Sequence, residues 1–393
     1  MTPAARVQAA IDILDAVIEA ALRGGAPADR IATDWFRSHR FAGSKDRRAI
    51  RDLIWSAIRA CGEVPPSGRA AVLRLAQADS ALAALFSGEG YGPAPIAPGE
   101  PIAAAGTAPQ WLVERLEASG LDQAEQEALL DRAPLDIRTN RLKTTREELA
   151  CTLPVEAEFT AAPDALRLPY GTQAESWPQF ADGLFEVQDT GSQLACSVLG
   201  AAPGESVVDL CAGAGGKTLA LAAQMDNRGE LMACDIDRPR LSRLPDRAVR
   251  AGARAETRLL NPGKEAAMLS DWQGRADAVL VDAPCSGTGT WRRNPEARWR
   301  IDAAAIDRYS ATQAHVLEIA AGLVKPGGRI GYITCSLLDS EGADRIEAFL
   351  RAHPDWRAEP VTCPLGTPRG PGWRLTPFRD DTDGFFFATL RRL

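Results

Sequence analysis

From residue 185 to the C-terminus, short apolar runs of strand length alternate with helical stretches. The predicted strands are 206–210, 230–234, 278–281 and 329–334, and residues 218–225 form the first helix between them. Strands that alternate with helices build a mostly parallel sheet with helices on its faces. In such sheets ligands bind at the carboxyl ends of the strands. The polar residues that follow each strand are therefore the candidate functional residues.

A glycine-rich turn joins the first of these strands to the next helix over residues 209–218 (DLCAGAGGKT). A P-loop requires glycine where this turn has Cys211, and a dinucleotide fingerprint requires glycine where it has Thr218. What remains is an acid at the strand end, Asp209, followed by small residues and glycine. This pattern suits a cofactor pressed against bare backbone, with its charged end near the helix N-terminus.

A second acid, Asp235, ends the following strand, 26 residues after Asp209. A carboxylate at that position can accept hydrogen bonds from both hydroxyls of a ribose. An adenosine cofactor without a pyrophosphate fits the two acids and the turn. The spacing therefore favours S-adenosylmethionine over a purely structural glycine turn.

Two cysteines follow two further strands. Cys285 lies in the turn DAPCSGTG (282–289) after strand 278–281, and Cys335 directly follows strand 329–334. If these strands are neighbours, both thiols face one cleft with the cofactor. A single cysteine is most often a small buried hydrophobic residue. Two cysteines at the expected active edge, one beside an acid and a proline-fixed turn, favour a catalytic role instead.

Methylation of cytosine at C5 is a reaction that can use such a pair of thiols. The C5 carbon is a poor nucleophile until a thiolate adds to C6 and makes an enamine. Afterwards a base must remove the C5 proton, and a second cysteine can assist that release. Asp282 can hydrogen-bond the N3/N4 edge of the ring, and the target base must leave its stack to be attacked from its face. The spacing alone does not decide which cysteine attacks.

Basic and aromatic residues follow the first of these cysteines. The segment 291–300 contains, against a single acid at Glu296, the residues Trp291, Arg292, Arg293, Arg298, Trp299 and Arg300. Interleaved cations and aromatic rings beside an active site suit a splayed RNA strand. The two tryptophans could equally belong to a core, and the sequence leaves both interpretations open.

The first half of the chain predicts three other parts. Apolar residues recur at helical spacing over 7–22 and 50–58, and residues 71–86 are rich in alanine and leucine, so residues 1–88 form a helical domain. Prolines alternate with glycines over 89–109, which predicts a linker. Residues 110–184 mix short helices with a strand at 136–140 and predict a small α+β subdomain.

The composition is that of a globular protein. Hydrophobic residues make up 45% and charged residues 25% of the 393 residues, which excludes a disordered chain and a collagen. The 8 Cys and 3 His show no metal-ligand spacing, so we expect neither a zinc site nor a disulfide framework. The net charge of −7 argues against a protein that coats nucleic acid through bulk charge. The N-terminus lacks a signal-peptide layout, so a cytoplasmic location is the default expectation.

Over about residues 105–393, these motifs resemble the RsmB/NOP2/Sun-type RNA cytosine-5 methyltransferases. The matching runs are FEVQD with SQ (185–193), DLCA and GGKT in the turn, DAPCSGTG (282–289), TCSL (334–337) with Glu341, and DGFF (383–386). Residues 134–143 resemble the small RNA-binding subdomain of that family. FAGS (41–44) and DRR (46–48) are similar to the NusB-like domain of its bacterial members.

The resemblance implies a multidomain fold. It comprises an α-helical NusB-like RNA-binding domain (1–88), a linker (89–109), a small α+β RNA-binding subdomain (110–184) and an α/β Rossmann-like class I methyltransferase domain (185–393). The implied reaction transfers a methyl group from S-adenosylmethionine to C5 of a cytosine in RNA, with ribosomal RNA as the expected substrate. We expect a monomer that needs neither a metal nor a membrane.

The resemblance also implies a role for each site residue. Cys335 is the nucleophile, Cys285 aids release, and Asp282 lies near the centre of methyl transfer. The residues implied to hold the cofactor are Cys211, Ala212, Gly213, Ala214, Gly215, Gly216, Lys217, Asp235, Asn261 and Asp282.

Two positions depart from the family pattern. The family's loop usually reads CAAPGGK, whereas this chain has Gly213 and Ala214 at the third and fourth positions. This change loosens the turn and lowers the expected affinity for the cofactor, while the backbone path survives. The family also commonly has an aspartate after the third strand, near the adenine, where this chain has Asn261. An amide there can still accept one hydrogen bond and donate another.

Two other functions remain open. A methyltransferase that acts on tRNA or DNA needs the same pair of thiols, although the resemblance disfavours DNA because those enzymes carry the nucleophile in the fourth motif. A non-catalytic RNA-binding or ribosome-assembly factor on the same scaffold would account for the altered loop and the acidic charge. The presence of Asp282 together with both cysteines argues against that factor.

Overall fold

The computed structural model describes residues 1–393, which form two compact units. The first unit comprises Met1–Arg132 with Thr290–Asp302, and the second comprises Ala133–Gly289 with Ala303–Leu393. None of the helices combines the length and the apolar character needed to span a membrane. No group of three or more His, Cys, Asp or Glu side chains is arranged to hold a metal ion.

The first unit is helical. Its helices are α1 (Pro3–Arg23), α2 (Ala28–Ser38), α3 (Ser44–Ala60), α4 (Gly68–Ala76), α5 (Ser80–Ala83), α6 (Gln110–Ala118) and α7 (Gln123–Ala128). Helix α1 begins where the Thr2 side chain accepts a hydrogen bond from the Ala5 N–H, and it ends at Gly24 with φ of 72°. The segment predicted as a linker has no helix, but Ala105 within it forms an isolated bridge with Cys61. Helices α6 and α7 belong to this unit, whereas the sequence placed residues 110–132 in the α+β subdomain.

The segment that follows Gly289 is part of the helical unit. Trp291 is fully buried, and Trp299, in the short 3₁₀ helix Pro295–Trp299, packs into the core formed by α1, α2, α3 and α4. The fully buried Arg298 donates to the carbonyls of Ile58 and Cys61 at 2.6 and 2.7 Å, where α3 ends. Of the two interpretations of the tryptophans, the core one is therefore confirmed. The expectation that this basic and aromatic run holds RNA is wrong for Trp291, Arg298 and Trp299, because their side chains are inaccessible.

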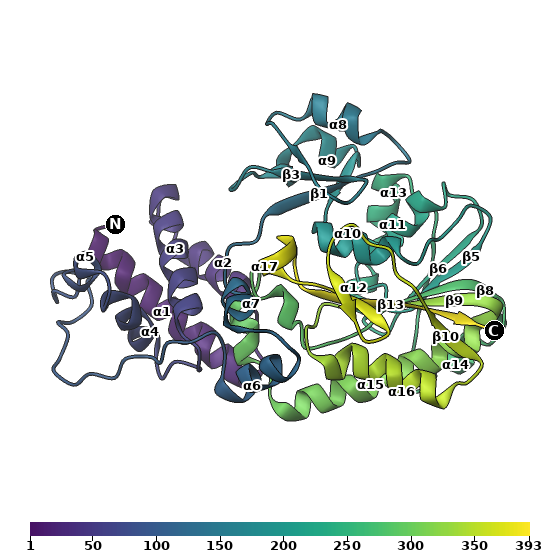
Figure 1. The fold of residues 1–393 in the computed structure, drawn as a ribbon. Coiled ribbons are helices and arrows are strands. Elements are labelled where there is room, and N and C mark those ends of the chain that lie inside the picture. The colour runs from purple at the N-terminus through teal and green to yellow at the C-terminus, as the bar shows by residue number, and fades with distance from the viewer. The chain divides into compact units, whose positions relative to one another are not determined.

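The second unit contains two sheets (Figure 1). The smaller is antiparallel in the order β2-β3-β1-β4. Its strands are β1 (Leu135–Thr139), β2 (Glu158–Phe159), β3 (Ala165–Leu168) and β4 (Phe185–Val187), with helices α8 (Arg146–Thr152) and α9 (Pro178–Ala181). Apolar side chains from β1, β3, β4 and α8 form a separate small core around Ile137 and Phe185.

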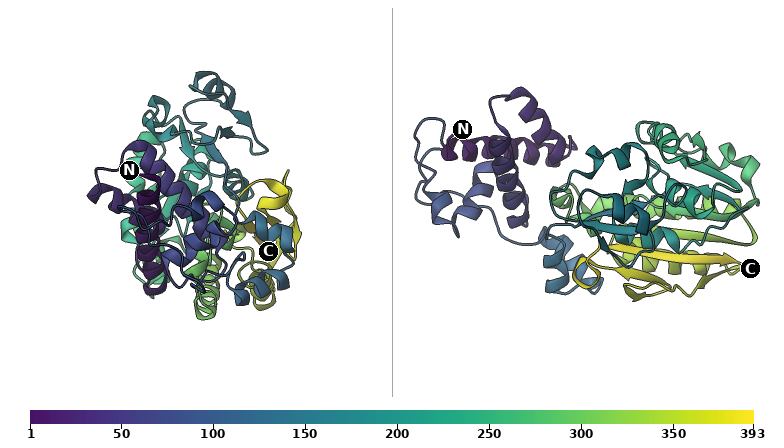
Figure 2. Two further views of the ribbon diagram at one scale, coloured as in Figure 1. Left: turned by 90° about the vertical axis from the view of Figure 1, so that its left-hand side faces the viewer. Right: turned by 90° about the horizontal axis from the view of Figure 1, so that it is seen from above.

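The larger sheet carries the candidate site. Its order is β11-β12-β13-β9-β8-β5-β6-β7, with β10 paired to β13. Strands β7, β6, β5, β8 and β9 are parallel, and β13 runs antiparallel to β9 and reaches the C-terminus (Figure 2). The strands are β5 (Ser206–Asp209), β6 (Glu230–Asp235), β7 (Glu256–Leu259), β8 (Ala276–Asp282), β9 (Val324–Thr334), β10 (Trp356–Glu359), β11 (Thr367–Arg369), β12 (Gly372–Leu375) and β13 (Phe385–Arg392).

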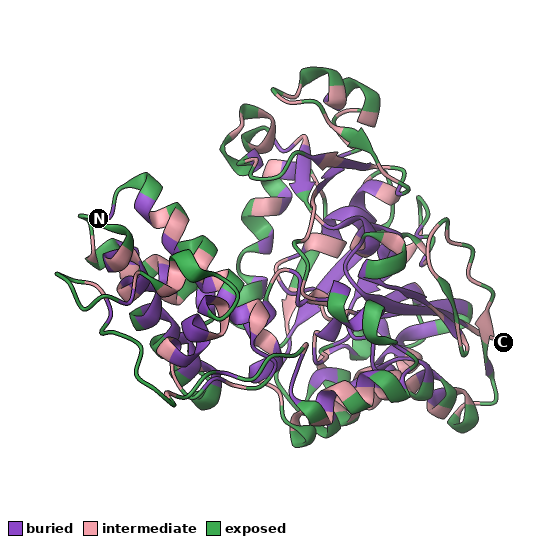
Figure 3. Ribbon diagram, turned by 60° about the vertical axis from the view of Figure 1, so that its left-hand side comes forward, coloured by how far each residue is buried: buried purple, intermediate pink, exposed green.

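Helices cover both faces of this sheet (Figure 1). They are α10 (Thr190–Ser197), α11 (Gly216–Gln224), α12 (Arg238–Leu241), α13 (Leu244–Ala251), α14 (Glu265–Met268), α15 (Ala303–Leu323), α16 (Ala343–Ala352) and α17 (Pro377–Asp380). Strand β8 shows why both faces are apolar. Val279 and Val281 pack with residues of α15 and α16, whereas Ala278 and Leu280 pack with residues of α10 and α11. The middle parts of the central strands are therefore buried (Figure 3).

This architecture confirms the predicted fold class, a helical part, a small mixed sheet and a Rossmann-like domain. The four strands predicted from residue 206 onward are present, and the last of them begins earlier than predicted, at Val324. Because β5, β6, β8 and β9 are parallel, their carboxyl ends lie at one edge of the sheet. That edge contains the predicted site residues.

Candidate functional site

The glycine-rich turn runs from the end of β5 to the start of α11. Asp209 is fully buried, and its Oδ2 accepts a hydrogen bond from the Thr218 hydroxyl at 2.6 Å. Burial raises the pKa of this carboxyl to about 7. Gly215 has φ of 88°, and a Cβ there would lie 2.1 Å from a Leu244 methyl carbon. Asp209 therefore ties together the two ends of the turn, and Gly215 allows α13 to pack closely against it.

Asp235 orients its carboxylate at the end of β6. Its Oδ2 accepts the Gly213 N–H at 2.6 Å, and its Oδ1 accepts the Asp237 N–H at 2.7 Å. Asn261 lies at the same edge, two residues after β7 ends, and is exposed. Leu260, the residue before Asn261, donates its N–H to the Asp235 carbonyl at 2.8 Å. The predicted contacts of Asp235 with the ribose and of Asn261 with the adenine remain predictions.

The turn fits a small zwitterionic cofactor. Helix α11 begins at Gly216 without a side-chain cap, so its first N–H groups face the turn, where a carboxylate can bind. The Asp235 carboxylate lies beside the same turn and can accept from hydroxyl groups. A helix N-terminus and a strand-end acid are the donor and acceptor set that S-adenosylmethionine requires.

Lys217, in the first turn of α11, reaches Asp282 at the end of β8. Its Nζ lies 2.6 Å from Asp282 Oδ2, and it also lies 5.8 Å from the centre of the Phe385 ring. Burial lowers the pKa of the Lys217 ammonium, but the Asp282 carboxylate outweighs burial, and the pKa lies above its usual value. Lys217 is therefore protonated at neutral pH. The Asp282 side chain is 33% exposed, so it remains accessible to a substrate.

Cys285 and Cys335 meet at the neighbouring strand ends. Strands β8 and β9 are parallel with Asp282 opposite Ile333, which confirms that they are neighbours. The two Sγ atoms lie 3.4 Å apart, and both side chains are partly exposed. The hydrogen bond to Cys335, together with burial, raises the pKa of the Cys285 thiol well above its usual value. Cys285 is therefore protonated at neutral pH as long as its hydrogen bond to Cys335 is in place.

A buried carboxylate joins the two cysteine-bearing turns. Glu341 is fully buried, and its Oε1 accepts the Ser286 N–H at 2.9 Å. Its Oε2 accepts the Ser336 hydroxyl at 2.6 Å and also contacts the Ser286 hydroxyl. Gln313, from α15, donates to Glu341 Oε1 at 3.1 Å. Because Ser286 and Ser336 each follow a cysteine directly, Glu341 fixes the distance between the two thiols.

Sequence reasoning quoted Glu341 as part of a motif but gave it no role. Its contact with Ser286 spans 55 positions and was not visible in any local pattern. The sequence offers only a weak signal, because Glu341 lies six residues after Cys335 and Asp339 stands in the same stretch.

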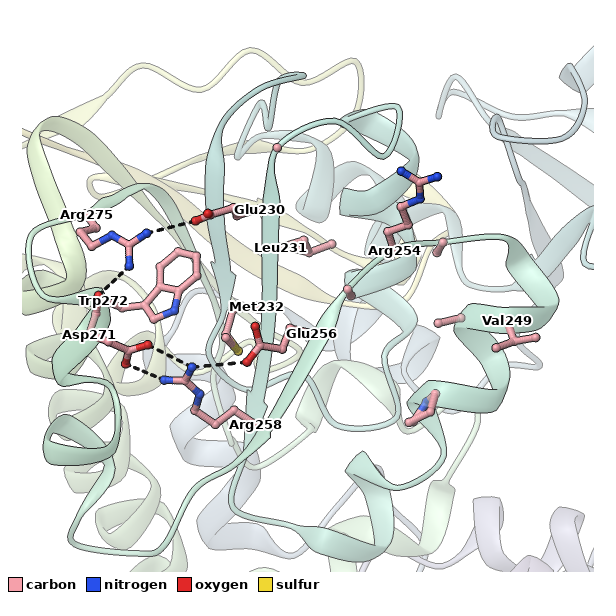
Figure 4. Close-up of a pocket in the computed structure, with 15 residues that line it drawn as sticks. Glu230, Leu231, Met232, Val249, Arg254, Glu256, Arg258, Asp271, Trp272 and Arg275 are labelled. Carbon is pink, nitrogen blue, oxygen red and sulfur yellow. Dashed lines mark hydrogen bonds and ion pairs between the residues drawn. The ribbon is translucent and has the colours of Figure 1, made fainter.

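A cavity of about 710 Å³ is lined by residues of β6, β7 and α13 (Figure 4). It opens at the amino-terminal ends of β6 and β7, opposite the edge that carries the cysteines. Most of its charged side chains satisfy one another, since Arg258 lies 2.6 Å from Asp271 and Arg275 lies 3.3 Å from Glu230. Arg254 is the lining cation without such a pair, and the cavity lies at the opposite edge from the predicted site residues, so the candidate site remains the carboxyl edge.

Comparisons with known proteins identify the family to which the chain is similar. Residues 196–391 match the family model described as 16S rRNA methyltransferase RsmB/F. The chain is 37% identical over 290 residues to ribosomal RNA small subunit methyltransferase B of Klebsiella pneumoniae subsp. pneumoniae, which covers 72% of this chain and 65% of the relative. It is 35% identical over 292 residues to the protein of the same name from Serratia proteamaculans, with 72% and 66% covered. The chain thus spans about two thirds of the length of these curated relatives.

Solved structures show the same architecture. The crystal structure of PH0851 superposes with a TM-score of 0.77 and 26% identity, and the match covers 100% of this chain and 99% of that one. A methyltransferase homologue from Pyrococcus horikoshii superposes with a TM-score of 0.59 and 26% identity, covering 72% of this chain and 99% of that one. Together with the matched motifs, these relatives show that the chain belongs to the RsmB/F family of methyltransferases, whose cofactor is S-adenosylmethionine.

Proposed function

We propose that the chain methylates C5 of a cytosine in RNA, with ribosomal RNA of the small subunit as the substrate. The observation that carries this proposal is the 3.4 Å separation of two thiols beside Asp282, at the edge that suits the cofactor. Other methyl acceptors, such as an exocyclic amine, need no second thiol. The names of the relatives support the choice of ribosomal RNA.

The turn 211–217, Asp235, Asn261 and Asp282 hold S-adenosylmethionine in this proposal, and the bound cofactor supplies the methyl group. The Cys335 thiolate attacks C6 of the flipped cytosine, forms an S–C6 bond and raises the electron density at C5. Asp282 is paired with Lys217 and hydrogen-bonds the N3/N4 edge of the ring. This contact orients the ring for attack from its face.

Cys285 then completes the reaction as the base. Its pKa is raised largely by the hydrogen bond to Cys335, so that influence disappears once Cys335 is bonded to C6. The Cys285 thiol then releases its own proton to solvent, and the resulting thiolate takes the C5 proton. The electrons of the C5–H bond restore the C5–C6 double bond, and Cys335 leaves as a thiolate. The arrangement therefore supports Cys335 as nucleophile and Cys285 as the residue that assists release.

The test is methyl transfer from labelled S-adenosylmethionine to small-subunit RNA from cells that lack this enzyme, followed by nuclease digestion and mass spectrometry. The proposal expects label in 5-methylcytidine for the wild type and none for Cys335→Ala. Cys151→Ala is a matched control, because Cys151 is an exposed thiol on α8, away from the sheet edge that carries the site. Label in another nucleoside, or full activity of Cys335→Ala, would contradict the proposal. Binding of RNA without any methyl transfer would favour the non-catalytic assembly factor.

A further inference from the structure

The cofactor turn has no proline, yet its backbone is held from outside. At the fourth position of the turn, Ala214 leaves φ unrestrained by its side chain, and Gly213 before it has φ of 55°. Such a pair costs more conformational entropy on ordering than alanine followed by proline. Some other contact must keep the turn in one conformation if the cofactor is to bind a preformed site.

Arg247, in α13, makes that contact. Its Nη1 donates to the Ala214 carbonyl at 2.7 Å, and its Nη2 donates to Glu186 Oε2 at 2.7 Å. The Arg247 side chain is 28% exposed, whereas the Glu186 side chain is 6% exposed. A buried carboxylate therefore fixes the guanidinium, and the guanidinium fixes the turn. A charge-assisted hydrogen bond to a carbonyl is stronger than one between neutral groups.

The carboxylate belongs to the small sheet. Glu186 lies in β4, and a second arginine, Arg250 of α13, binds its other oxygen. The same sheet reaches the turn again through Arg138 of β1, whose Nη1 donates to the Gly216 carbonyl at 2.9 Å. Two carbonyls of the turn are thus held by arginines whose positions depend on β1 and β4.

We propose that Arg247, held by Glu186, is a positioning residue that sets the affinity of this chain for S-adenosylmethionine by fixing the turn at Ala214. It takes the place of the restraint that a proline would give at that position. The small sheet thereby controls the cofactor site, although none of its residues is in the predicted cofactor set. The inference depends on use of the cofactor and is independent of which RNA is modified.

Two further substitutions serve as a rescue variant, Ala214→Pro, and a control variant, Arg250→Ala. Ala214 does not have a positive φ, and its N–H makes no hydrogen bond that a proline would remove, so neither feature forbids Ala214→Pro. Arg250 binds the same carboxylate but does not touch the turn, since its guanidinium lies 3.9 Å from the centre of the Phe180 ring. Arg250→Ala therefore separates loss of the Glu186 contact from loss of the turn contact.

The experiment is titration calorimetry of the full chain with S-adenosylmethionine, with thermal unfolding recorded for each variant. We expect Arg247→Ala to weaken binding about tenfold, a loss in the range for a hydrogen bond to a charged group. Arg250→Ala should change the affinity less than about twofold, since the turn contact stays in place. Arg247→Ala with Ala214→Pro should recover most of the lost affinity. If Arg247→Ala does not fold, Arg247→Gln, which keeps a donor for the carbonyl, should lose about threefold.

Three results would overturn the proposal. They are unchanged affinity in a folded Arg247 variant, an equal loss in Arg250→Ala, and no recovery on adding Ala214→Pro. A wild-type chain that does not bind the cofactor at all would refute the proposed function as well. That outcome is distinguishable from the other three, because it needs no variant.

Discussion

The sulfur atoms of Cys285 and Cys335 lie 3.4 Å apart although the residues are 50 positions apart in the chain. Three interactions impose this distance. Strands β8 and β9 are parallel neighbours in a fixed register, and the Gly289 N–H donates to the Cys335 carbonyl at 2.9 Å. The buried Glu341 then joins the residues that follow each cysteine. The distance between the thiols is thus a property of the sheet edge and one carboxylate.

Loss of Glu341 should therefore separate the thiols without affecting the cofactor. Glu341→Ala leaves the Ser286 N–H and the Ser336 hydroxyl without their buried acceptor, at a cost of about 3 kcal/mol in the free energy of unfolding. We expect turnover to fall roughly a hundredfold, as for other losses of active-site geometry. The affinity for S-adenosylmethionine should stay unchanged. Asp339→Ala is the control, because Asp339 lies two residues away and pairs with Arg369. Equal turnover in both variants would exclude this role.

The buried Asp209 should make stability fall as the pH rises. Its pKa is about 7 in the folded chain because of burial, against a reference of 3.8. Between these values the folded state holds a proton that the unfolded state has lost, so this group's contribution falls by roughly 4 kcal/mol over that range. Thermal unfolding at pH 5 and pH 8 tests this. Asparagine does not titrate, so the melting temperature of Asp209→Asn relative to the wild type should be higher at pH 8 than at pH 5. The same difference at both pH values would contradict the assignment.

Arg298 should stabilise the helical unit and should not act as an RNA ligand. Its guanidinium is fully buried and donates to backbone carbonyls at the end of α3. Arg298→Met leaves these carbonyls unpaired, so we expect a loss of about 3 kcal/mol in the free energy of unfolding. Limited proteolysis should show earlier cleavage within residues 1–132, with unchanged affinity for S-adenosylmethionine. If Arg298→Met resists the protease as well as the wild type does but binds RNA more weakly, Arg298 is an RNA ligand and this prediction is wrong.

Local pattern was enough to predict the sheet edge but not the contacts that organise it. The strand ends at Asp235 and Asp282 follow from apolar runs of the right length, and parallel pairing brings them together. The segment 291–300 could not be interpreted in this way. A run of arginines and tryptophans has the same composition whether it binds RNA or packs on α3, and its partners Ile58 and Cys61 lie 237 or more positions away.

The cofactor turn shows the same limit. The replacement of proline by Ala214 was visible in the sequence and predicted a looser turn. The contact between Arg247 and Glu186 that compensates for this change could not be predicted from local pattern. It spans 61 positions and joins α13, beside the larger sheet, to β4 of the smaller sheet. A change in a motif can therefore be judged only together with the residues that pack against it.

The most direct test of the central claim uses Cys285→Ala with RNA and S-adenosylmethionine. If Cys335 attacks C6 and Cys285 removes the C5 proton, the variant should stop after methyl transfer. A protein–RNA adduct that survives denaturation should then accumulate, and sequencing of its RNA would identify the modified nucleotide. Cys335→Ala and the double variant should give no adduct. Wild-type rates of methylation by Cys285→Ala, with no adduct, would contradict the assigned roles of the two thiols.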